Sequence, residues 1–456
     1  MDTIHGIIKL INGYLWGPPM LVVLFGTHLF LTVRLRGIQR YVFLAIRLSF
    51  QKEDDGHGDV SHFGSLTTAL AATIGTGNIV GVATAVAMGG PGAVLWCWLT
   101  GVFGIATKYA EALLAVKYRV RTEDGTMLGG PMYALEKGLG KKWLAVVFCV
   151  FTALAAFGIG NMVQANSIAV MARETFSIDP WITGLALAAL TAIVILGGIR
   201  SIARVCEVLV PFMAAFYVLG CVVILVINRE FLLQTLSLIV TAAFTPQAAG
   251  GGFVGSTIMT AARFGIARGL FSNESGLGSA PIVAAAAKTR NPVRQALVSS
   301  TGTFWDTVVV CALTGLVLVS TIIAHPEMTV GTNGAALTKA AFSKIPAVGP
   351  IVLTVGLLTF VFSTILGWSY YGERAVEYLF GKIAIRPYRL VWVVAVMAGS
   401  VVSLPLVWDL ADAMNAMMAL PNLAALLLLN GVIVLETKKY LWDDNLHLAM
   451  EHDEVV

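Results

Sequence analysis

The stretch TIGTGNIVG, Thr73–Gly81, interrupts a hydrophobic segment that is long enough to cross a membrane. A second interruption, RGLFSNESGLGSAP at Arg268–Pro281, lies in a similar segment of the second half of the chain. Backbone groups that leave a helix at membrane depth find no partner in lipid, so such a break needs protein, an ion or a bound molecule beside it. Broken helices in matching positions of two halves are the best sequence pointer to a transporter's binding site.

The composition places the chain in a lipid bilayer. Apolar residues make up 57% of its 456 positions and charged residues 12%, against roughly 25% charged in soluble domains. The segment 231–245 is apolar but too short to cross, so we expect it at the interface or as a helix within a loop. Apolar windows of about 20 residues predict an all-α polytopic membrane protein with eleven transmembrane helices, near 13–33, 65–88, 92–117, 142–172, 180–199, 205–228, 253–286, 296–323, 348–380, 390–404 and 408–436.

The basic residues predict the orientation, because cytoplasmic loops collect lysine and arginine. With the N-terminus outside and the C-terminus in the cytoplasm, the predicted cytoplasmic loops hold 21 of the 30 basic residues and the external segments hold five. The net charge of +4 therefore reflects topology and indicates no nucleic-acid partner. Asp2 and the lack of a basic region before Leu21 predict that the first helix is an uncleaved anchor of a multi-pass cell-membrane protein.

Several classes of protein are excluded by missing motifs. The five cysteines lie in or beside predicted helices without CxxC spacing, which is typical of packing residues. The seven histidines form no HExxH motif, and no GxSxG or Walker-type loop is present, so neither an enzyme nor an ATP site is predicted. Repeated filter loops of a channel are absent, and no predicted loop is long enough for a signalling domain. No obligate protein partner is evident.

The helices that follow the first one divide into two sets of five, and each glycine break lies in the first helix of its set. An odd number of helices per repeat turns the second copy upside down relative to the first. This spacing predicts an N-terminal helix with a cytoplasmic loop, an inverted repeat of five helices, an external connection, a second repeat and a cytoplasmic tail. The corresponding ranges are 1–62, 63–228, 229–252, 253–436 and 437–456.

Four further motifs carry a family resemblance. They are GGPGAVLWCWLTGVFG at Gly89–Gly104, GGPMY at Gly129–Tyr133, GIGNMVQANS at Gly158–Ser167 and TGTFWDT at Thr301–Thr307. Together with the second break they resemble the alanine or glycine:cation symporter family over about residues 14–436. The resemblance implies a LeuT-type fold with one additional N-terminal helix. It also implies Na⁺-coupled symport of small neutral amino acids, alanine and glycine, into the cell by alternating access.

The first break predicts one half of a substrate site. Unwinding at Gly75 and Gly77 frees backbone amides, and the half-helix that follows presents its positive end to a substrate carboxylate. Thr73 and Thr76 add hydroxyl groups, and Asn78 adds an amide. The alternative is that these glycines only allow helices to pack closely.

The second break predicts the other half. We expect the backbone of Ser275 and Gly276 to contact the amino group of the substrate. An ionisable residue inside a membrane is a functional candidate by default. The role of Glu274 is therefore open between that of a functional carboxylate and that of an internal ion pair with Arg268, six residues away.

Gln164 and Asn161 are three residues apart, and they therefore lie near one face of a predicted helix. A glutamine amide can donate to a carboxylate and accept from an ammonium group. We expect Gln164 to contact the substrate and Asn161 to form a hydrogen bond between helices.

The segment FSTILGW predicts a cation site. By resemblance to the LeuT-type sodium site, the hydroxyls of Ser363 and Thr364 would form an oxygen cage for Na⁺ with the carbonyls of Ala71 and Ile74. Alternatively, the hydroxyls bond back to carbonyls one turn earlier. Trp368 shares the helix face of Thr364 and would limit the pocket to alanine-sized side chains, unless it belongs to an interfacial aromatic belt.

Three charged residues remain. Lys108 and Glu111 are predicted to form an ion pair that snorkels near the cytoplasmic end of a helix. Asp306 is open between a protonatable coupling group and a carboxylate paired with Arg263 or Arg268. A proton-coupled carrier of the same fold, with Asp306 or Glu274 essential, is therefore the alternative function.

Overall fold

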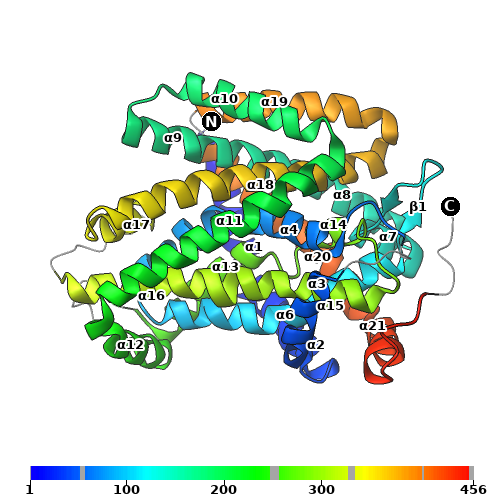
Figure 1. Ribbon diagram of the computed structural model, residues 1–456, viewed down its shortest axis with the longest axis horizontal. Coiled ribbons are helices and arrows are strands. Elements are labelled where there is room, and N and C mark those ends of the chain that lie inside the picture. Colours follow the sequence, from blue (N-terminus) through cyan, green and yellow to red (C-terminus); the bar gives the residue numbers. More distant parts are fainter. Residues whose placement is uncertain (1, 52–56, 247–255, 327–333, 403–404, 451–456) are drawn as a thin grey trace.

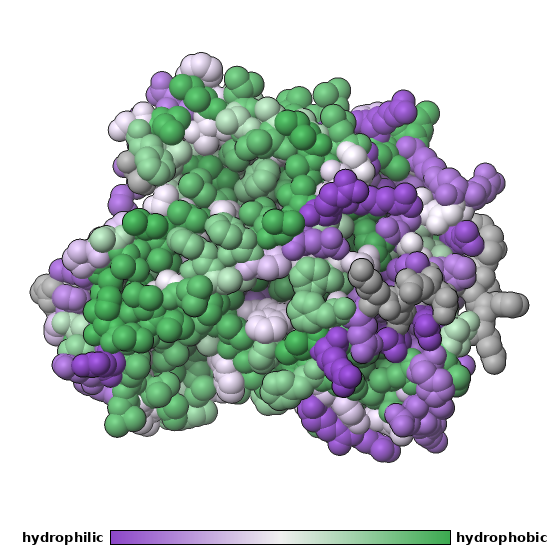
Figure 2. Space-filling view, in the orientation of Figure 1, coloured by the Kyte–Doolittle hydropathy of each residue, from purple (hydrophilic) through white to green (hydrophobic). Residues whose placement is uncertain are grey.

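The chain is helical along nearly its whole length in the computed structural model, which describes residues 2–51, 57–246, 256–326, 334–402 and 405–450 (Figure 1). Most long helices run between two polar ends of the molecule. One end carries the strands, α7 and the C-terminal tail, and the other carries α12 and α17 (Figure 1). Hydrophobic side chains cover much of the surface between these ends (Figure 2). This is the surface expected of a protein that lies across a bilayer.

The first half of the chain contains a run of helices and one short antiparallel hairpin. The helices are α1 (Asp2–Leu15), α2 (Pro18–Arg34), α3 (Val42–Ser49), α4 (His62–Thr73), α5 (Val82–Gly89), α6 (Ala93–Lys117), α7 (Pro131–Tyr133), α8 (Lys142–Phe157), α9 (Val163–Phe176), α10 (Pro180–Ile195) and α11 (Gly198–Ile227). In the hairpin, β1 (Val120–Arg121) pairs with β2 (Met127–Leu128).

The second half of the chain is also mainly helical. Its helices are α12 (Leu232–Phe244), α13 (Ile258–Asn273), α14 (Pro281–Ala284), α15 (Pro292–Thr303), α16 (Ala312–Ala324), α17 (Gly334–Ser343), α18 (Val348–Phe380), α19 (Ile385–Val401), α20 (Pro405–Leu428) and α21 (Asn430–Thr437). Wide π-helical turns join α5, α9 and α16 to the segments before them, at Gly77–Gly81, Gly158–Met162 and Phe304–Cys311. Such turns are frequent at functional sites.

Local sequence accounts for the helix ends that position the site. The Oγ of Ser61 accepts a hydrogen bond from the N–H of Gly64 (2.8 Å) and caps the start of α4. The side chain of Asn291 accepts in the same way from the N–H of Arg294 (3.1 Å) before α15. Gly381 ends α18 with a φ of 76°, which glycine adopts without steric cost.

The prediction of a helical protein with many membrane spans is confirmed. In the described part of the chain, eight helices are long and apolar enough to cross a membrane, and the bent pair of α4 with the segment Gly77–Gly89 makes nine. Helix α18 has the predicted bounds, 348–380. The short apolar segment 231–245 forms α12, as expected of a loop helix. The chain is thus a multi-pass helical membrane protein.

Both glycine-rich stretches break their helices, as predicted. Helix α4 ends at Thr73, and the helix that resumes at Gly77 is inclined to it by 53°. Helix α13 ends at Asn273, and the turn that follows has positive φ angles at Glu274 (55°), Gly276 (92°) and Gly278 (87°).

The two breaks belong to one packed unit, because the loop before α4 pairs with the chain after α14. His57 forms a bridge with Thr289, and Val60 forms one with Ala287. Asp59 in the same loop is half-buried, and burial raises the pKa of its carboxyl group. Residues that begin the first broken helix are therefore held against the end of the second.

Candidate functional site

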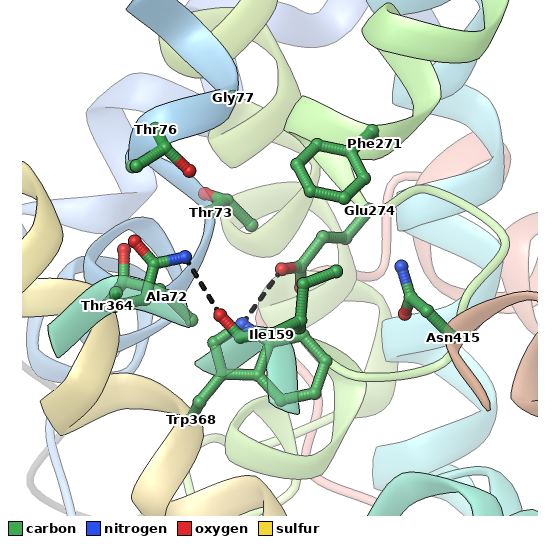
Figure 3. A pocket seen from close by; sticks show the side chains of 12 residues that line it. Ala72, Thr73, Thr76, Gly77, Ile159, Phe271, Glu274, Thr364, Trp368 and Asn415 are labelled. Carbon is green, nitrogen blue, oxygen red and sulfur yellow. Dashed lines mark hydrogen bonds between the residues drawn. The ribbon is translucent and has the colours of Figure 1, made fainter. Parts of the chain in front are cut away.

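A small cavity lies where the break after α4 faces the end of α13 (Figure 3). Helices α8–α9, α18 and α20 complete the wall. The lining residues are Ala72, Thr73, Gly75, Thr76, Gly77, Ile159, Gln164, Phe271, Glu274, Thr364, Trp368 and Asn415. Seven of them, Thr73, Gly75, Thr76, Gly77, Gln164, Thr364 and Trp368, are predicted site residues.

The two glycines of the first break are needed for close contact as well as for unwinding. A Cβ atom on Gly75 would lie 2.7 Å from the Oγ1 of Thr364 on α18. A Cβ on Gly77 would lie 3.3 Å from Phe271 and from the backbone of Ser272 on α13. The packing explanation is therefore confirmed, since these glycines let two other helices approach the break, and their contact with a substrate carboxylate stays a prediction.

Asn78 does not line the cavity. Its Oδ1 accepts a hydrogen bond from the N–H of Gly75 (2.8 Å), and its Nδ2 donates to Oδ1 of Asp306 (2.7 Å). The side chain therefore fixes the shape of the break and connects it to α15–α16. A direct contact of Asn78 with substrate remains a prediction.

Asp306 is fully buried and is held by neutral donors. Its Oδ2 accepts hydrogen bonds from Ser272 (3.0 Å) and Thr307 (2.6 Å). Arg263 and Arg268 lie in the described part of the chain, and neither forms an ion pair with Asp306, so that expectation is wrong. Instead of an arginine, hydroxyl and amide donors from three elements around the break bind the Asp306 carboxylate.

Glu274 is the charged residue among the twelve that line the cavity. Its Oε1 accepts a hydrogen bond from the Nε1 of Trp368 (3.1 Å) (Figure 3). Its Oε2 accepts one from the hydroxyl of Ser279 (2.5 Å). Glu274 and Arg268 are both described, and they form no ion pair. The internal ion pair that the sequence left open is therefore not formed.

The backbone after Glu274 turns away from the cavity. The N–H of Ser275 donates to Oδ1 of Asn273 (2.9 Å), and its hydroxyl is hydrogen-bonded to Thr303 (3.1 Å). The N–H of Gly276 donates to Oε1 of Glu111 (3.0 Å). Neither Ser275 nor Gly276 lines the cavity, so a substrate contact by these residues stays a prediction.

Lys108 and Glu111 do not form the predicted ion pair. The Oε1 of Glu111 instead accepts from the N–H groups of Gly276 and Gly278 (3.0 Å each) and from Asn422 (2.6 Å). Lys108 is 3% exposed, and its Nζ has no hydrogen-bond partner. The charged group of Lys108 does not reach the membrane surface, because other helices surround α6 and 83% of its most apolar window is buried.

Lys108 is nevertheless electrostatically important. Its positive charge acts on three buried carboxylates, those of Glu111, Glu274 and Asp306. Buried charges in membranes are normally compensated by opposite charges nearby. Lys108 itself forms no hydrogen bond with any of these three carboxyl groups.

The four oxygens of the predicted cation site come together between α4 and α18. Ser363 donates a hydrogen bond to the carbonyl of Ala71 (3.1 Å), and Thr364 donates to that of Ile74 (3.5 Å). Both hydroxyls also bond back to the carbonyl of Phe360 (2.8 and 3.0 Å), which is the alternative. Within the described residues no three His, Cys, Asp or Glu side chains converge as a metal site. Carbonyl and hydroxyl oxygens are thus the candidate cation ligands here.

The amide side chains of Gln164 and Asn415 also line the cavity. Gln164 donates from Nε2 to the carbonyl of Ile159 (2.8 Å), which leaves its buried Oε1 without a partner. The Oδ1 of Asn415 is also buried without a partner. Asn161 donates to the carbonyl of Trp392 on α19 (2.9 Å), so the predicted bond between helices is confirmed.

Sequence reasoning missed the apolar wall formed by Ile159 and Phe271, and it missed Asn415. Ile159 and Phe271 look like ordinary core residues, and nothing local marks them. Asn415 offered a signal, because an amide in the middle of a membrane helix needs a reason to be there.

A bundle of membrane helices with a small, partly polar cavity between two broken helices defines a secondary transporter. The fold is similar to that of MhsT, solved in complex with L-phenylalanine, with a TM-score of 0.59 and 16% identity, covering 86% of this chain and 95% of MhsT. This likeness establishes the LeuT-type fold. The model of the Sodium:alanine symporter family matches residues 1–453, and the chain belongs to that family.

Two relatives match over nearly their whole length. The sodium/alanine symporter AgcS of Methanococcus maripaludis is 53% identical over 448 residues, which are 96% of this chain and 98% of AgcS. An uncharacterized transporter of Haemophilus influenzae is 52% identical over 443 residues, 96% of each chain. The protein is therefore a cation-coupled amino-acid symporter of a membrane and not an enzyme.

Proposed function

We propose that the protein carries alanine and glycine into the cell together with Na⁺. The contact of Ser363 and Thr364 with the carbonyls of Ala71 and Ile74 carries this proposal. It places hard oxygen ligands, which alkali ions prefer, at the break that also lines the cavity. The relationship to AgcS supports alanine as the substrate and sodium as the ion.

The substrate carboxylate lies at the first break in this proposal. The helix that resumes at Gly77 has no side-chain cap, so the positive end of its dipole and the N–H of Gly77 can face an anion, whereas the N–H of Asn78 donates to the carbonyl of Gly75 (3.3 Å). Thr73 and Thr76 line the cavity beside it. Trp368, Phe271 and Ile159 close the apolar side, which limits the side chain of the substrate to the size of alanine.

Sodium and substrate bind cooperatively, because both act on the same break. A Na⁺ ion between α4 and α18 fastens the first broken helix to Thr364 and thereby completes the cavity wall. By linkage, each ligand then raises the affinity for the other. The inward Na⁺ gradient drives accumulation of the amino acid as the two repeats rock around the site.

The topology in this proposal has eleven membrane helices, with an external N-terminus and a cytoplasmic C-terminus. An inverted pair of five-helix repeats, 63–228 and 253–436, follows the first helix. The helix bounds support it, because α4 and α13 each begin a repeat and each ends in a break. The hairpin of β1 and β2, which belongs to a predicted cytoplasmic loop, lies at one polar end, and α12 and α17 lie at the other (Figure 1).

Proton coupling is the second candidate, and the geometry of Asp306 and Glu274 favours it as the alternative. Both carboxylates are buried beside the break and are held by neutral donors. A carboxylate in such a place can exchange a proton with either side of the membrane as access alternates.

Uptake of labelled alanine into proteoliposomes distinguishes the two. We expect accumulation with an inward Na⁺ gradient and none with a proton gradient alone. Thr364→Ala should weaken the Na⁺ dependence, whereas Thr359→Ala, which removes a hydroxyl one turn away on α18, should not. Accumulation driven by protons alone, or an unchanged Na⁺ dependence in Thr364→Ala, would contradict the proposal.

A further inference from the structure

We propose that the carboxylate of Glu274 binds the ammonium group of the transported amino acid. The inference rests on the proposed function and adds to it the residue that recognises the amino end of the substrate. Sequence reasoning assigned that task to the backbone of Ser275 and Gly276, whose N–H groups the structure directs to other partners.

The position of Glu274 is the first argument. Its side chain lines the cavity and is 5% exposed, and its two oxygens accept from Trp368 and Ser279, which are neutral. A buried carboxylate without a contacting cation is costly, so it is normally paired or binds a ligand. Trp368 and Ser279 also hold the carboxylate in one orientation, which prepares it to receive a cation.

The charges around the cavity give the second argument. Lys108 acts on Glu274 electrostatically, but its Nζ contacts no acceptor and its charge is shared with Glu111 and Asp306. The other residues that line the cavity are uncharged. A substrate ammonium would therefore supply positive charge where the protein lacks it.

The local conformation gives a third argument. Glu274 caps the C-terminus of α13 in the left-handed region, with a φ of 55°. Glycine or asparagine is favoured in this conformation, and a negative charge at a helix C-terminus opposes the helix dipole. Neither backbone geometry nor helix electrostatics explains a glutamate here, whereas a cationic ligand does.

The two helix ends at the cavity match the polarity of a zwitterion. The uncapped N-terminus at Gly77 attracts a carboxylate, and the C-terminus of α13 with Glu274 attracts an ammonium group. These ends are adjacent, because Gly77 packs directly against Phe271 and Ser272.

The buried amides of the cavity agree with this arrangement. Gln164 and Asn415 each have a buried oxygen that lacks a hydrogen-bond donor. An ammonium group has three N–H donors, and Glu274 offers the charged acceptor in the cavity that these two amides also line. The site thus selects molecules with a free amino group, and it discriminates against the corresponding hydroxy acid and against the unsubstituted acid.

The test compares wild type with Glu274→Gln in proteoliposomes under a saturating Na⁺ gradient. We expect the KM for alanine to rise about 10- to 100-fold, which is what loss of one hydrogen bond to a charged group produces. Competition by lactate and propionate provides the specific readout. Alanine should compete far better than either in wild type, and this preference should shrink by the same factor in Glu274→Gln.

Two further variants separate recognition from folding. Glu377→Gln removes another buried carboxylate, on α18 and outside the cavity, and it should lower thermal stability in detergent without changing the KM for alanine. Glu274→Asp keeps the charge and should retain more of the preference for alanine over lactate than Glu274→Gln does.

The possible failures are distinguishable. If wild type accumulates alanine but Glu274→Gln keeps the wild-type KM and the preference over lactate, the inference is overturned and the symporter proposal stands. If wild type accumulates no alanine with Na⁺, the proposed function fails, and the inference fails with it.

Discussion

Replacing Gly75 with alanine tests the cation site by a steric change of known size. The backbone of Gly75 lies outside the left-handed region, so an alanine is allowed there and the effect comes from the new methyl group alone. That Cβ would lie 2.7 Å from the Oγ1 of Thr364, which is about 0.7 Å closer than ordinary contact at 3.4 Å. The other atoms of Thr364 are 3.7 Å or more away, so the hydroxyl alone must move.

Moving this hydroxyl removes one oxygen from the proposed cage. The rotation breaks the hydrogen bonds of Thr364 to the carbonyls of Ile74 (3.5 Å) and Phe360 (3.0 Å). Overpacking of this kind costs about 1–3 kcal/mol. Because this cost falls on the Na⁺-binding geometry, we expect the half-saturating Na⁺ concentration to rise by about 5- to 150-fold.

The assay is a Na⁺ titration of alanine uptake in proteoliposomes at a fixed membrane potential. Gly81→Ala is the matched control, because a Cβ there meets no atom closer than 4.0 Å. In the Thr364→Ala background the clash is absent, so Gly75→Ala should add no further loss there. Equal half-saturating Na⁺ concentrations for Gly75→Ala and Gly81→Ala would refute the reasoning, as would full additivity with Thr364→Ala.

Two other variants test the wall of the cavity and the stability of α18. Trp368→Phe keeps an aromatic ring but loses the N–H that donates to Glu274 (3.1 Å). Because such a hydrogen bond is worth roughly 0.5–1.5 kcal/mol, the KM for alanine should rise about 3- to 10-fold. An unchanged KM would contradict this prediction. Arg374→Met leaves Glu377 without its buried partner (2.6 Å), whereas Glu373 keeps Arg389. It should lower the free energy of unfolding by about 3–5 kcal/mol. Thermal unfolding in detergent measures the second effect, and a variant as stable as wild type would count against it.

The helices could be predicted from the sequence because hydrophobicity distinguishes a lipid environment from water. Helix α18 runs unbroken between Ala347 and Gly381, its first two thirds are mainly apolar, and its bounds were predicted correctly. The start of the chain was harder, since the stretch before Gly17 mixes polar and apolar residues, yet it forms α1. The helix Gly334–Ser343 was missed for the same reason, because it is short and only moderately apolar.

The break positions could also be predicted, since glycine clusters inside membrane helices have few structural explanations. The partners of the polar side chains could not. Asn78 and Asp306 are 228 positions apart, and nothing local indicates that they bond. Lys108 and Glu111 have the spacing of an ion pair, but the amides freed at the second break compete successfully for the carboxylate. Sequence spacing describes neighbours on one helix, whereas the buried contacts of this protein are made between helices.

The same contrast explains why Glu274 and Trp368 become informative only in three dimensions. In the sequence, Glu274 has an arginine six residues away and Trp368 lies on an apolar helix, so each has an ordinary explanation. In the structure these residues bond to each other across the cavity, 94 positions apart, and the arginine is not used. The helix that resumes at Gly77 has no side-chain cap, and α13 ends in a carboxylate that lacks a contacting cation. In our proposal, these two helix ends of opposite polarity, packed against each other at Gly77, match the two charges of an amino acid.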